Sequence, residues 1–287
     1  MPVPSGTASL QDIQDEFGGS HPIAISEYYG AAAGVPASGT ISINDFRGKS
    51  NTFSFTLTSN QQNYDVRAAA VSAGWDGSSE VELTINSGVT VYASSTSNYA
   101  CSFTGSFPSG AKLINNGIIV GRGGNGGNGY AGNGACYGYA PYGGGSGGGT
   151  GGPGLYTSVA LSVTNNNRIA GGGGGGGGGY PSNFSWGGSG AGGGLGISSG
   201  GSPGTHGYGY GNGGTLTAFG YGGTPRSQAG SGCPWVEVGG QGGNGGTYGA
   251  GGSAPGSSSA PGVGGNYITG NSNVTWVVTG TRNGGVA

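Results

Sequence analysis

The sequence predicts a mostly β and irregular protein in three parts, and three observations support this prediction. Residues 1–50 repeat a short motif typical of capped helical turns, residues 51–116 alternate apolar and polar residues, and residues 117–287 are dominated by glycine. We therefore expect a module of short helical repeats, a small β-rich domain, and a glycine-rich bundle whose helices are connected by loops.

The composition favours a folded chain over a collagen-like or disordered one. Glycine accounts for 77 of the 287 residues, yet there are only 13 prolines and the glycine register breaks repeatedly, which excludes collagen. A disordered chain would carry few aromatic residues and a high net charge. This chain has 16 Tyr, 8 Phe and 4 Trp and a formal charge of −2.

The N-terminal repeat has three related copies, at residues 6–13, 22–30 and 39–48. Ser9 with Asp12, and likewise Ser42 with Asp45, have the spacing at which a serine caps a helix and a carboxylate supports its first turn. Each copy would form a helical turn or two. Isolated helices this short are marginal in water, so we expect them to bury no core of their own and to need a partner surface.

The middle part contains four runs with the alternation of half-buried strands, at 53–58, 80–85, 89–94 and 99–107. We expect these runs to form antiparallel strands. The segment at 64–75 is rich in alanine and has a glycine near its end, which favours a short helix.

The glycine-rich part has a period of three over several runs, for example at Gly145, Gly148, Gly151 and Gly154, and residues 171–179 are all glycine. That period belongs to the left-handed polyproline-II-type helix, which makes no internal hydrogen bonds. A helix side without Cβ atoms lets neighbours approach and pair their backbone groups. The runs are short, so the chain must turn back between them, which predicts a bundle of roughly six to eight polyglycine-type helices. A flexible linker is the alternative, but aromatic residues recur between the runs.

Two segments within this part resemble each other, at residues 113–121 and 163–171, and each leads into a glycine run. We expect both to form short strands or turns on one flank of the bundle.

The sequence offers little chemistry for an enzyme. Residues 117–287 contain one carboxylate side chain, Glu237, one histidine, His206, and no aspartate. Paired carboxylates for glycoside hydrolysis and a Ser-His-Asp triad are therefore excluded there, and we expect no catalytic activity. His21 has no nearby cysteine or second histidine, so neither a metal site nor a cofactor is predicted. The glycine string at 121–126 fits a dinucleotide-binding fingerprint, but this composition produces such a match by chance.

Charge, hydropathy and cysteine spacing bear on three other classes: nucleic-acid-binding proteins, membrane proteins, and proteins stabilised by disulfides or zinc. The C-terminal arginines are too scattered for a nucleic-acid-binding stripe, being Arg122, Arg168, Arg226 and Arg282. The first residues lack the pattern of a signal peptide, and no run approaches the roughly 20 apolar residues that span a bilayer. We therefore expect a soluble protein made in the cytoplasm, without membrane insertion. Cys101, Cys136 and Cys233 predict neither a disulfide framework nor a zinc site, and whether Cys136 and Cys233 pair is left open.

The N-terminal repeats and the glycine runs together resemble bacteriophage tail proteins. Residues 36–50 (PASGTISINDFRGKS), with the segment before them, are similar to a module found at the start of many tail and tail-fibre proteins. The C-terminal region resembles the tail-fibre-tip adhesins of T-even-like phages. In those adhesins, glycine-rich motifs form a polyglycine-II sandwich and the segments between them form distal receptor-binding loops. The N-terminal module differs from the attachment domain of those adhesins.

The resemblance implies a tail-tip adhesin that recognises a host surface receptor, either an outer-membrane protein or a surface glycan. Other tail or fibre proteins would hold it at the distal end of the tail, through Ile25, Tyr28, Ile43 and Phe46 as candidate docking residues. The glycine-rich motifs would lie at 121–134, 143–154, 171–179, 187–196, 239–252 and 256–265. The receptor-binding segments would lie at 135–142, 180–186, 197–210 and 215–238. The leading contacts would be Tyr180, Phe184, Trp186, Tyr221, Arg226 and Trp235, with Arg226 placed to meet an acidic or phosphate group.

Two other functions compete with the adhesin interpretation. A structural tail-tip, baseplate or fibre-capping protein would tolerate loops of simple sequence without aromatic residues, whereas the segments between the glycine runs are irregular and aromatic. An ice-binding protein would need a flat face with little loop decoration, and it would give the N-terminal repeats no role.

Overall fold

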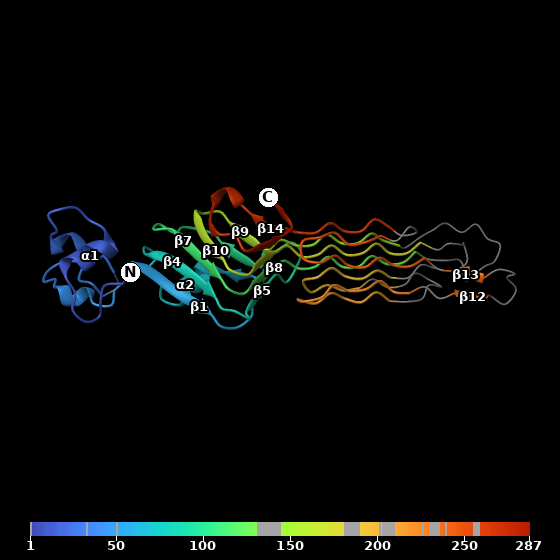
Figure 1. The fold of residues 1–287 in the computed structure, drawn as a ribbon, viewed down its shortest axis with the longest axis horizontal. Helices are drawn as coiled ribbons and strands as arrows, with labels where there is room; N and C mark the ends of the chain where they lie inside the picture. Colours follow the sequence, from blue (N-terminus) through green and yellow to red (C-terminus); the bar gives the residue numbers. More distant parts are fainter. Residues whose placement is uncertain are drawn as a thin grey trace.

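The computed structural model describes residues 2–32, 34–49, 51–130, 145–180, 190–200, 202, 210–224, 227–229, 236–238, 240–254 and 259–287. Figure 1 shows an elongated molecule in which the N-terminal module, a body of β-strands and a set of parallel glycine-rich segments follow one another. In the described ranges, no helix is long and apolar enough to cross a membrane.

The N-terminal module consists of helix α1 (Leu10–Phe17) and two 3-10 helices, η1 (Ile25–Tyr28) and η2 (Ile43–Phe46). Both predicted capping pairs form. Ser9 and Asp12 make a reciprocal capping box at α1, and Ser42 and Asp45 make one at η2. The hydrogen bond from Ser9 lowers the pKa of Asp12 below its usual value.

The module has a hydrophobic core of its own, so the expectation that the repeats bury no core was wrong. One large apolar residue of each copy points into this core, where Ile13, Tyr28 and Phe46 are almost completely buried. The Tyr28 and Phe46 rings meet edge to face at 6.0 Å between centroids. Each copy alone is too short to hide an apolar side chain, but three copies hide one another's.

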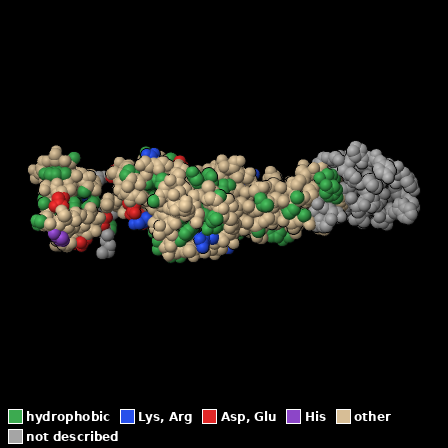
Figure 2. All heavy atoms as spheres, turned by 90° about the horizontal axis from the view of Figure 1, so that it is seen from above, with side chains coloured by type: hydrophobic (Ala, Val, Ile, Leu, Met, Phe, Trp, Pro, Cys, Tyr) green, Lys and Arg blue, Asp and Glu red, His purple; other side chains and the backbone are tan. Residues whose placement is uncertain are grey.

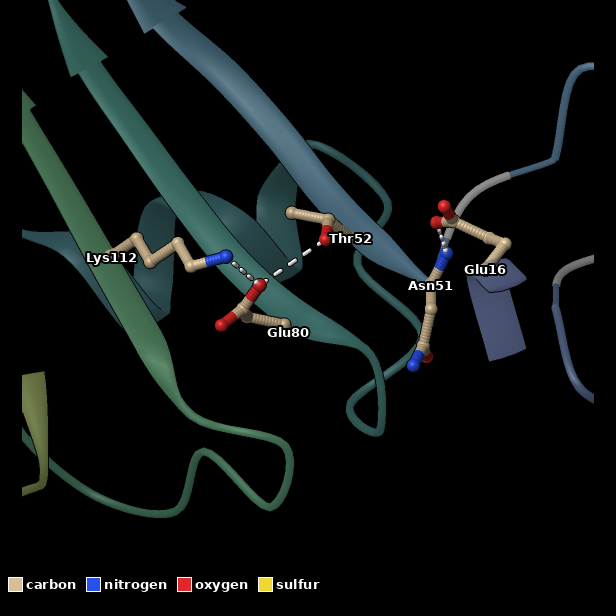
Figure 3. A network of polar contacts seen from close by, with 5 residues as sticks. All are labelled: Glu16, Asn51, Thr52, Glu80 and Lys112. Atoms are coloured by element: carbon tan, nitrogen blue, oxygen red, sulfur yellow. Dashed lines mark hydrogen bonds and ion pairs between the residues drawn. The ribbon is translucent and has the colours of Figure 1, made fainter. Parts of the chain in front are cut away.

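Two backbone hydrogen bonds between Val3 and residues 48–49 close the module, and a polar contact joins it to the β-strands. The Asn51 N–H donates to Glu16 Oε1 at 2.8 Å. Figure 3 shows this bond beside the contacts of Glu80, which accepts from Thr52 and pairs with Lys112 at 2.7 Å.

The strands form a three-sided parallel solenoid. Each turn of the chain, here called a coil, gives one strand to each of three five-stranded sheets. The first coil contains β1 (Thr52–Leu57), β2 (Gln61–Gln62) and β3 (Tyr64–Asp65), and the second contains β4 (Glu80–Ile85), β5 (Thr90–Tyr92) and β6 (Cys101–Phe103). The third contains β7 (Ala111–Asn115), β8 (Ile118–Val120) and β9 (Leu155–Thr157). The fourth contains β10 (Leu161–Asn165), β11 (Arg168–Ala170) and β14 (Asn266–Thr269). The fifth contains β15 (Val274–Val278), β16 (Thr281–Asn283) and β17 (Gly285–Val286), preceded by the 3-10 helix η3 (Asn271–Asn273).

The strands of each sheet run parallel, which corrects the expectation of antiparallel strands. Alternating polarity reveals that one face of a strand is buried, but it carries no information about the direction of the neighbour. The predicted helix is present as α2 (Val66–Ser72), between the first and second coils.

The coils stack side chains of the same kind into columns inside the solenoid. One column contains Phe55, Leu83, Leu113, Val163 and Trp276, each paired in register with the next. A single core cluster runs from Leu57 to Ile268. Strands from beyond residue 116 therefore complete the sheets that earlier strands begin, and the boundary predicted at residue 116 does not separate two cores.

The two similar segments at 113–121 and 163–171 occupy the same place in the third and fourth coils. β7 pairs with β10 and β8 with β11, both in parallel register. At the corner between these strands, the buried side chain of Asn115 donates to Asn165 Oδ1 at 2.8 Å, and Asn165 donates to Thr279 O. This ladder of amide groups satisfies backbone carbonyls where the chain bends.

The glycine-rich segments are insertions into the solenoid, and both leave and return at the corner between its second and third strands. Residues 121–154 lie between β8 and β9, and residues 171–265 lie between β11 and β14. We call each straight segment a rod. Within one rod, successive N–H groups donate to different neighbours with a period of three. Gly124 and Gly127 donate to Gly173 and Gly176, while Gly123 and Gly126 donate to Gly196 and Ser199.

The rod at 171–179 occupies the centre of the bundle, and all of its residues are buried. Its N–H groups donate to the rods at 145–154, 190–196 and 249–253, and its carbonyls accept from the rods at 121–130, 240–247 and 259–265. A Cβ at Gly172, Gly175 or Gly178 would fall onto a carbonyl oxygen of the rod at 121–130. A Cβ at either of the two other positions of the three-residue period would fall onto a carbonyl oxygen of a different neighbouring rod. A rod surrounded on every side has no outward position, and this explains why every residue in it is glycine.

The structure revises the extent of several runs. The motif predicted at 239–252 is two rods, because the chain reverses at Tyr248 and Gly249. Parts of the segments predicted as loops at 197–210 and 215–238 also belong to the bundle, since Gly126 donates to Ser199 O and Gly220 donates to Gly193 O.

We expect Gly175→Ala to destabilise the bundle as a whole. The added Cβ meets the Asn125 carbonyl, and separating the rods leaves buried hydrogen bonds unmade at roughly 1–3 kcal/mol each. Melting of the purified protein, followed by calorimetry, should fall by roughly 4 °C or more. The control is Gly251→Ala on an exposed rod, where the nearest atom to the new Cβ is Gly262 O at 3.3 Å. Equal melting temperatures for the two variants would contradict close packing of the rods.

Candidate functional site

The rod ends far from the solenoid form the first part of the candidate site. Tyr130 and Tyr180 end the rods that run outward from β8 and β11, and their rings stack at 3.9 Å between centroids with an interplanar angle of 17°. The Tyr180 hydroxyl donates to the Tyr130 hydroxyl at 3.0 Å. This bond lowers the pKa of Tyr130, which accepts, and raises the pKa of Tyr180, which donates. The pair closes the end of the central rod.

The rod connections near the solenoid are covered by it. Leu195, Leu216, Phe219 and Tyr248 come from three such turns and pack on Val120 and Ala170. Arg168 lies over the Tyr248 ring at 4.4 Å, and the Tyr248 hydroxyl donates to Leu216 O at 3.0 Å. These turns hold the bundle on the solenoid through apolar contacts.

Two of the predicted contact residues, Tyr180 and Tyr221, lie on the rods. Tyr180 is half-buried in its stack, whereas Tyr221 is 60% exposed on the rod at 218–224. Tyr221 therefore lies on the side of the bundle, near Tyr210, which is 73% exposed. Phe184, Trp186, Arg226 and Trp235 lie outside the described residues, as do Cys136 and Cys233. Near Arg226, the backbones of β12 (Ser227–Ala229) and β13 (Val236–Val238) form an antiparallel pair.

Two of the described arginines of the C-terminal part lie over aromatic rings. Arg282 lies over the Trp276 ring at 4.9 Å, and Arg168 lies over Tyr248. The face of the bundle in Figure 2 shows mainly backbone and polar side chains with isolated hydrophobic ones. Within the described part of the chain, no group of three potential metal ligands is close enough to hold an ion.

The predicted docking residues form part of the core of the N-terminal module. Tyr28 and Phe46 are buried, while Ile25 and Ile43 are partly buried against them. Their side chains fix the shape of the module and offer little surface to a partner. Sequence reasoning missed this packing, although the large apolar residue near the end of each copy was the signal for it.

Sequence reasoning also missed the exposed Tyr210, because residues 197–210 were assigned to one loop. Tyr210 lies on the rod that contains Asn212, which donates to Tyr221 O, and this rod does not continue the glycine period of the earlier runs.

Comparisons with known proteins bear on residues 52–287, which match the family described as phage tail fibre adhesin Gp38. A solved structure with a similar fold is the gp37-gp38 adhesin tip complex of the bacteriophage S16 long tail fibre. It has a TM-score of 0.64 and 23% sequence identity, and the match covers 99% of this chain and 94% of that chain. No curated protein sequence matches the chain.

We expect Tyr180→Ala and Tyr221→Ala to have different effects on stability. Loss of the stacked ring removes about 0.5–1.5 kcal/mol beyond its buried area, so Tyr180→Ala should lower the melting temperature by a few degrees. Tyr221→Ala removes a mostly exposed ring and should leave melting unchanged. Thermal unfolding of both variants tests this, and the reverse order of stability would show that the Tyr130–Tyr180 pair does not hold the rod ends.

Proposed function

The chain belongs to the family of phage tail fibre adhesins, and on this premise we propose that it recognises a host surface receptor and attaches the phage to the cell. It would act at the distal tip of the tail fibre. The observation that carries the proposal is the bundle of hydrogen-bonded rods, which extends away from the solenoid and is held on it by apolar turns.

We propose that the rods are polyglycine-II helices. The three-residue period of their hydrogen-bond partners supports this, since a helix with three residues per turn directs successive N–H groups to three different sides. The central rod, which has neighbours on all sides, supports it further. Such a scaffold holds its connections in fixed positions without the conformational cost that a flexible stalk would bring.

Receptor specificity would come from the segments between the rods together with the side of the bundle, where Tyr221 lies. The leading contacts would be Tyr180, Phe184, Trp186, Tyr221, Arg226 and Trp235. The rods carry too few side chains to discriminate partners. The segments at 131–144, 181–189, 203–209 and 225–239 contain seven aromatic residues between them, and such residues provide rigid contact area at low entropic cost. Variable connections on a rigid scaffold are a common arrangement for recognition.

The N-terminal module would join the adhesin to another tail or fibre protein. It lies outside the matched range of 52–287, and it folds around its own core. The S16 structure is a complex between two tail-fibre proteins, which supports a fibre protein as the partner here.

We predict that host range follows residues 181–189 and 225–239. Exchanging them for those of a related phage, with all rods kept, should transfer adsorption to the host of the related phage. Single truncations of a central aromatic anchor should cost about 2 kcal/mol, or roughly thirtyfold in affinity. The control exchanges the turn at 215–219, at the solenoid end. Adsorption that still follows another tail protein would indicate a structural cap without receptor contact.

We predict that a chain starting at Asn51 still binds host cells but no longer enters phage particles. The module has its own core, so its removal should leave the solenoid and the bundle folded. Cell binding of the purified protein and its presence in particles, detected by immunoblot, measure the two properties separately. Particles that incorporate the shortened chain would place the attachment surface on the solenoid instead.

A further inference from the structure

A polar pocket of about 490 Å³ lies at the root of the bundle, away from the far rod ends. It sits at the solenoid corner where the rods leave, beside the loop that follows β5. Its volume falls within the range of small-ligand sites. The lining residues are Ser94, Ser95 and Thr96 from the loop, Arg122 and Asn125 from the rod at 121–130, and Gly149, Thr150 and Gly151 from the rod at 145–154.

Arg122 is the charged residue of this pocket, and no carboxylate lines it. The guanidinium is half-buried, and its Nη1 donates to Ser94 O at 2.8 Å, which fixes the side chain in place. Among the described residues, no other acceptor engages the guanidinium. Its remaining donors can therefore meet a ligand, and their planar fork suits a carboxylate or a phosphate.

The rods supply further donors because each outer rod leaves part of its backbone unpaired. Gly124 and Gly126 donate to two different neighbours, but Asn125, between them, has an N–H without an acceptor in the described part of the chain. The same holds for Thr150, between Gly149 and Gly151. The carbonyl groups of these two residues differ in their hydrogen bonding, because Asn125 O already accepts a bond from the Gly149 N–H. Backbone donors thus add to the positive character of the pocket.

Hydroxyl groups complete the lining. Those of Ser95, Thr96 and Thr150 make no hydrogen bond to the described residues, and these three residues line the pocket together with Arg122. The loop that carries two of them is held in place, because Ser94 bonds to Asn63 and Asn98. The site is thus formed in advance by the solenoid corner and by two rods, which reduces the cost of ordering it on binding.

We propose that this pocket binds an anionic saccharide, a sugar that carries a carboxylate or a phosphate. The guanidinium and the backbone N–H groups match the acidic group, and the hydroxyls exchange hydrogen bonds with the sugar ring. The site is separate from the far rod ends. It would therefore exist whether or not the rod-end segments recognise a receptor.

The experiment measures binding to the purified full-length protein by titration calorimetry, using galacturonate, glucose 6-phosphate, glucose and inorganic phosphate as probes. We expect saturable binding of at least one acidic sugar and none of glucose. Galacturonate and glucose 6-phosphate distinguish a carboxylated from a phosphorylated sugar. Arg122→Gln should weaken binding about tenfold or more, and Arg122→Lys should weaken it less.

The matched control is Arg47→Gln, which removes the same charge from an exposed arginine of the N-terminal module and should leave binding unchanged. Melting curves of each variant verify the fold. The proposal is overturned if neither acidic sugar binds, if Arg122→Gln binds as the parent does, or if glucose binds equally well. Inorganic phosphate that binds as tightly as glucose 6-phosphate would overturn the assignment of a sugar ligand.

Discussion

The structure depends on the register in which the glycine rods pair, and that register is set by side chains outside the rods. Val120 pairs with Ala170 in the solenoid, and the next rods continue the alignment, with Gly121, Gly124 and Gly127 donating to Ala170, Gly173 and Gly176. A run of glycines looks the same at every residue, so it has no means of choosing one alignment over another. The packed columns of the solenoid make that choice at the root of the bundle.

The sequence predicted elements whose signals are local, and it failed where partners are distant. The capping boxes, α2 and the strand positions follow from spacing within a few residues. The direction of neighbouring strands does not follow from such local spacing, and the Asn116–Gly117 pair is an example. Such a dipeptide is typical of a hairpin, yet here it turns the chain from one sheet of the solenoid to the next. The rods at 210–224 were also missed, because outer rods need glycine only on their inner side and so lose its period.

The candidate site depends on contacts between distant segments that the sequence does not show. Tyr180 lies at a far rod end as its position after nine glycines suggested, but stacking on Tyr130 gives it a role in the fold that no sequence pattern showed. Tyr28 and Phe46 were read as docking residues because a short helix leaves apolar side chains exposed. Three copies that pack together remove that exposure. Arg122 was considered only as one of the scattered arginines, since its surroundings come from a loop and two rods that are separate in the sequence.

The orientation of the backbone hydrogen bonds has a mechanical consequence. The bonds between rods lie across the long axis, and the rods extend along it from the solenoid corner. A pull on the far end therefore loads the bonds of a rod in shear, all at once, instead of opening them one after another. Resistance to such a load grows with the number of bonds that share it. A bundle with almost no side-chain interior can thus transmit tension from its tip to the solenoid.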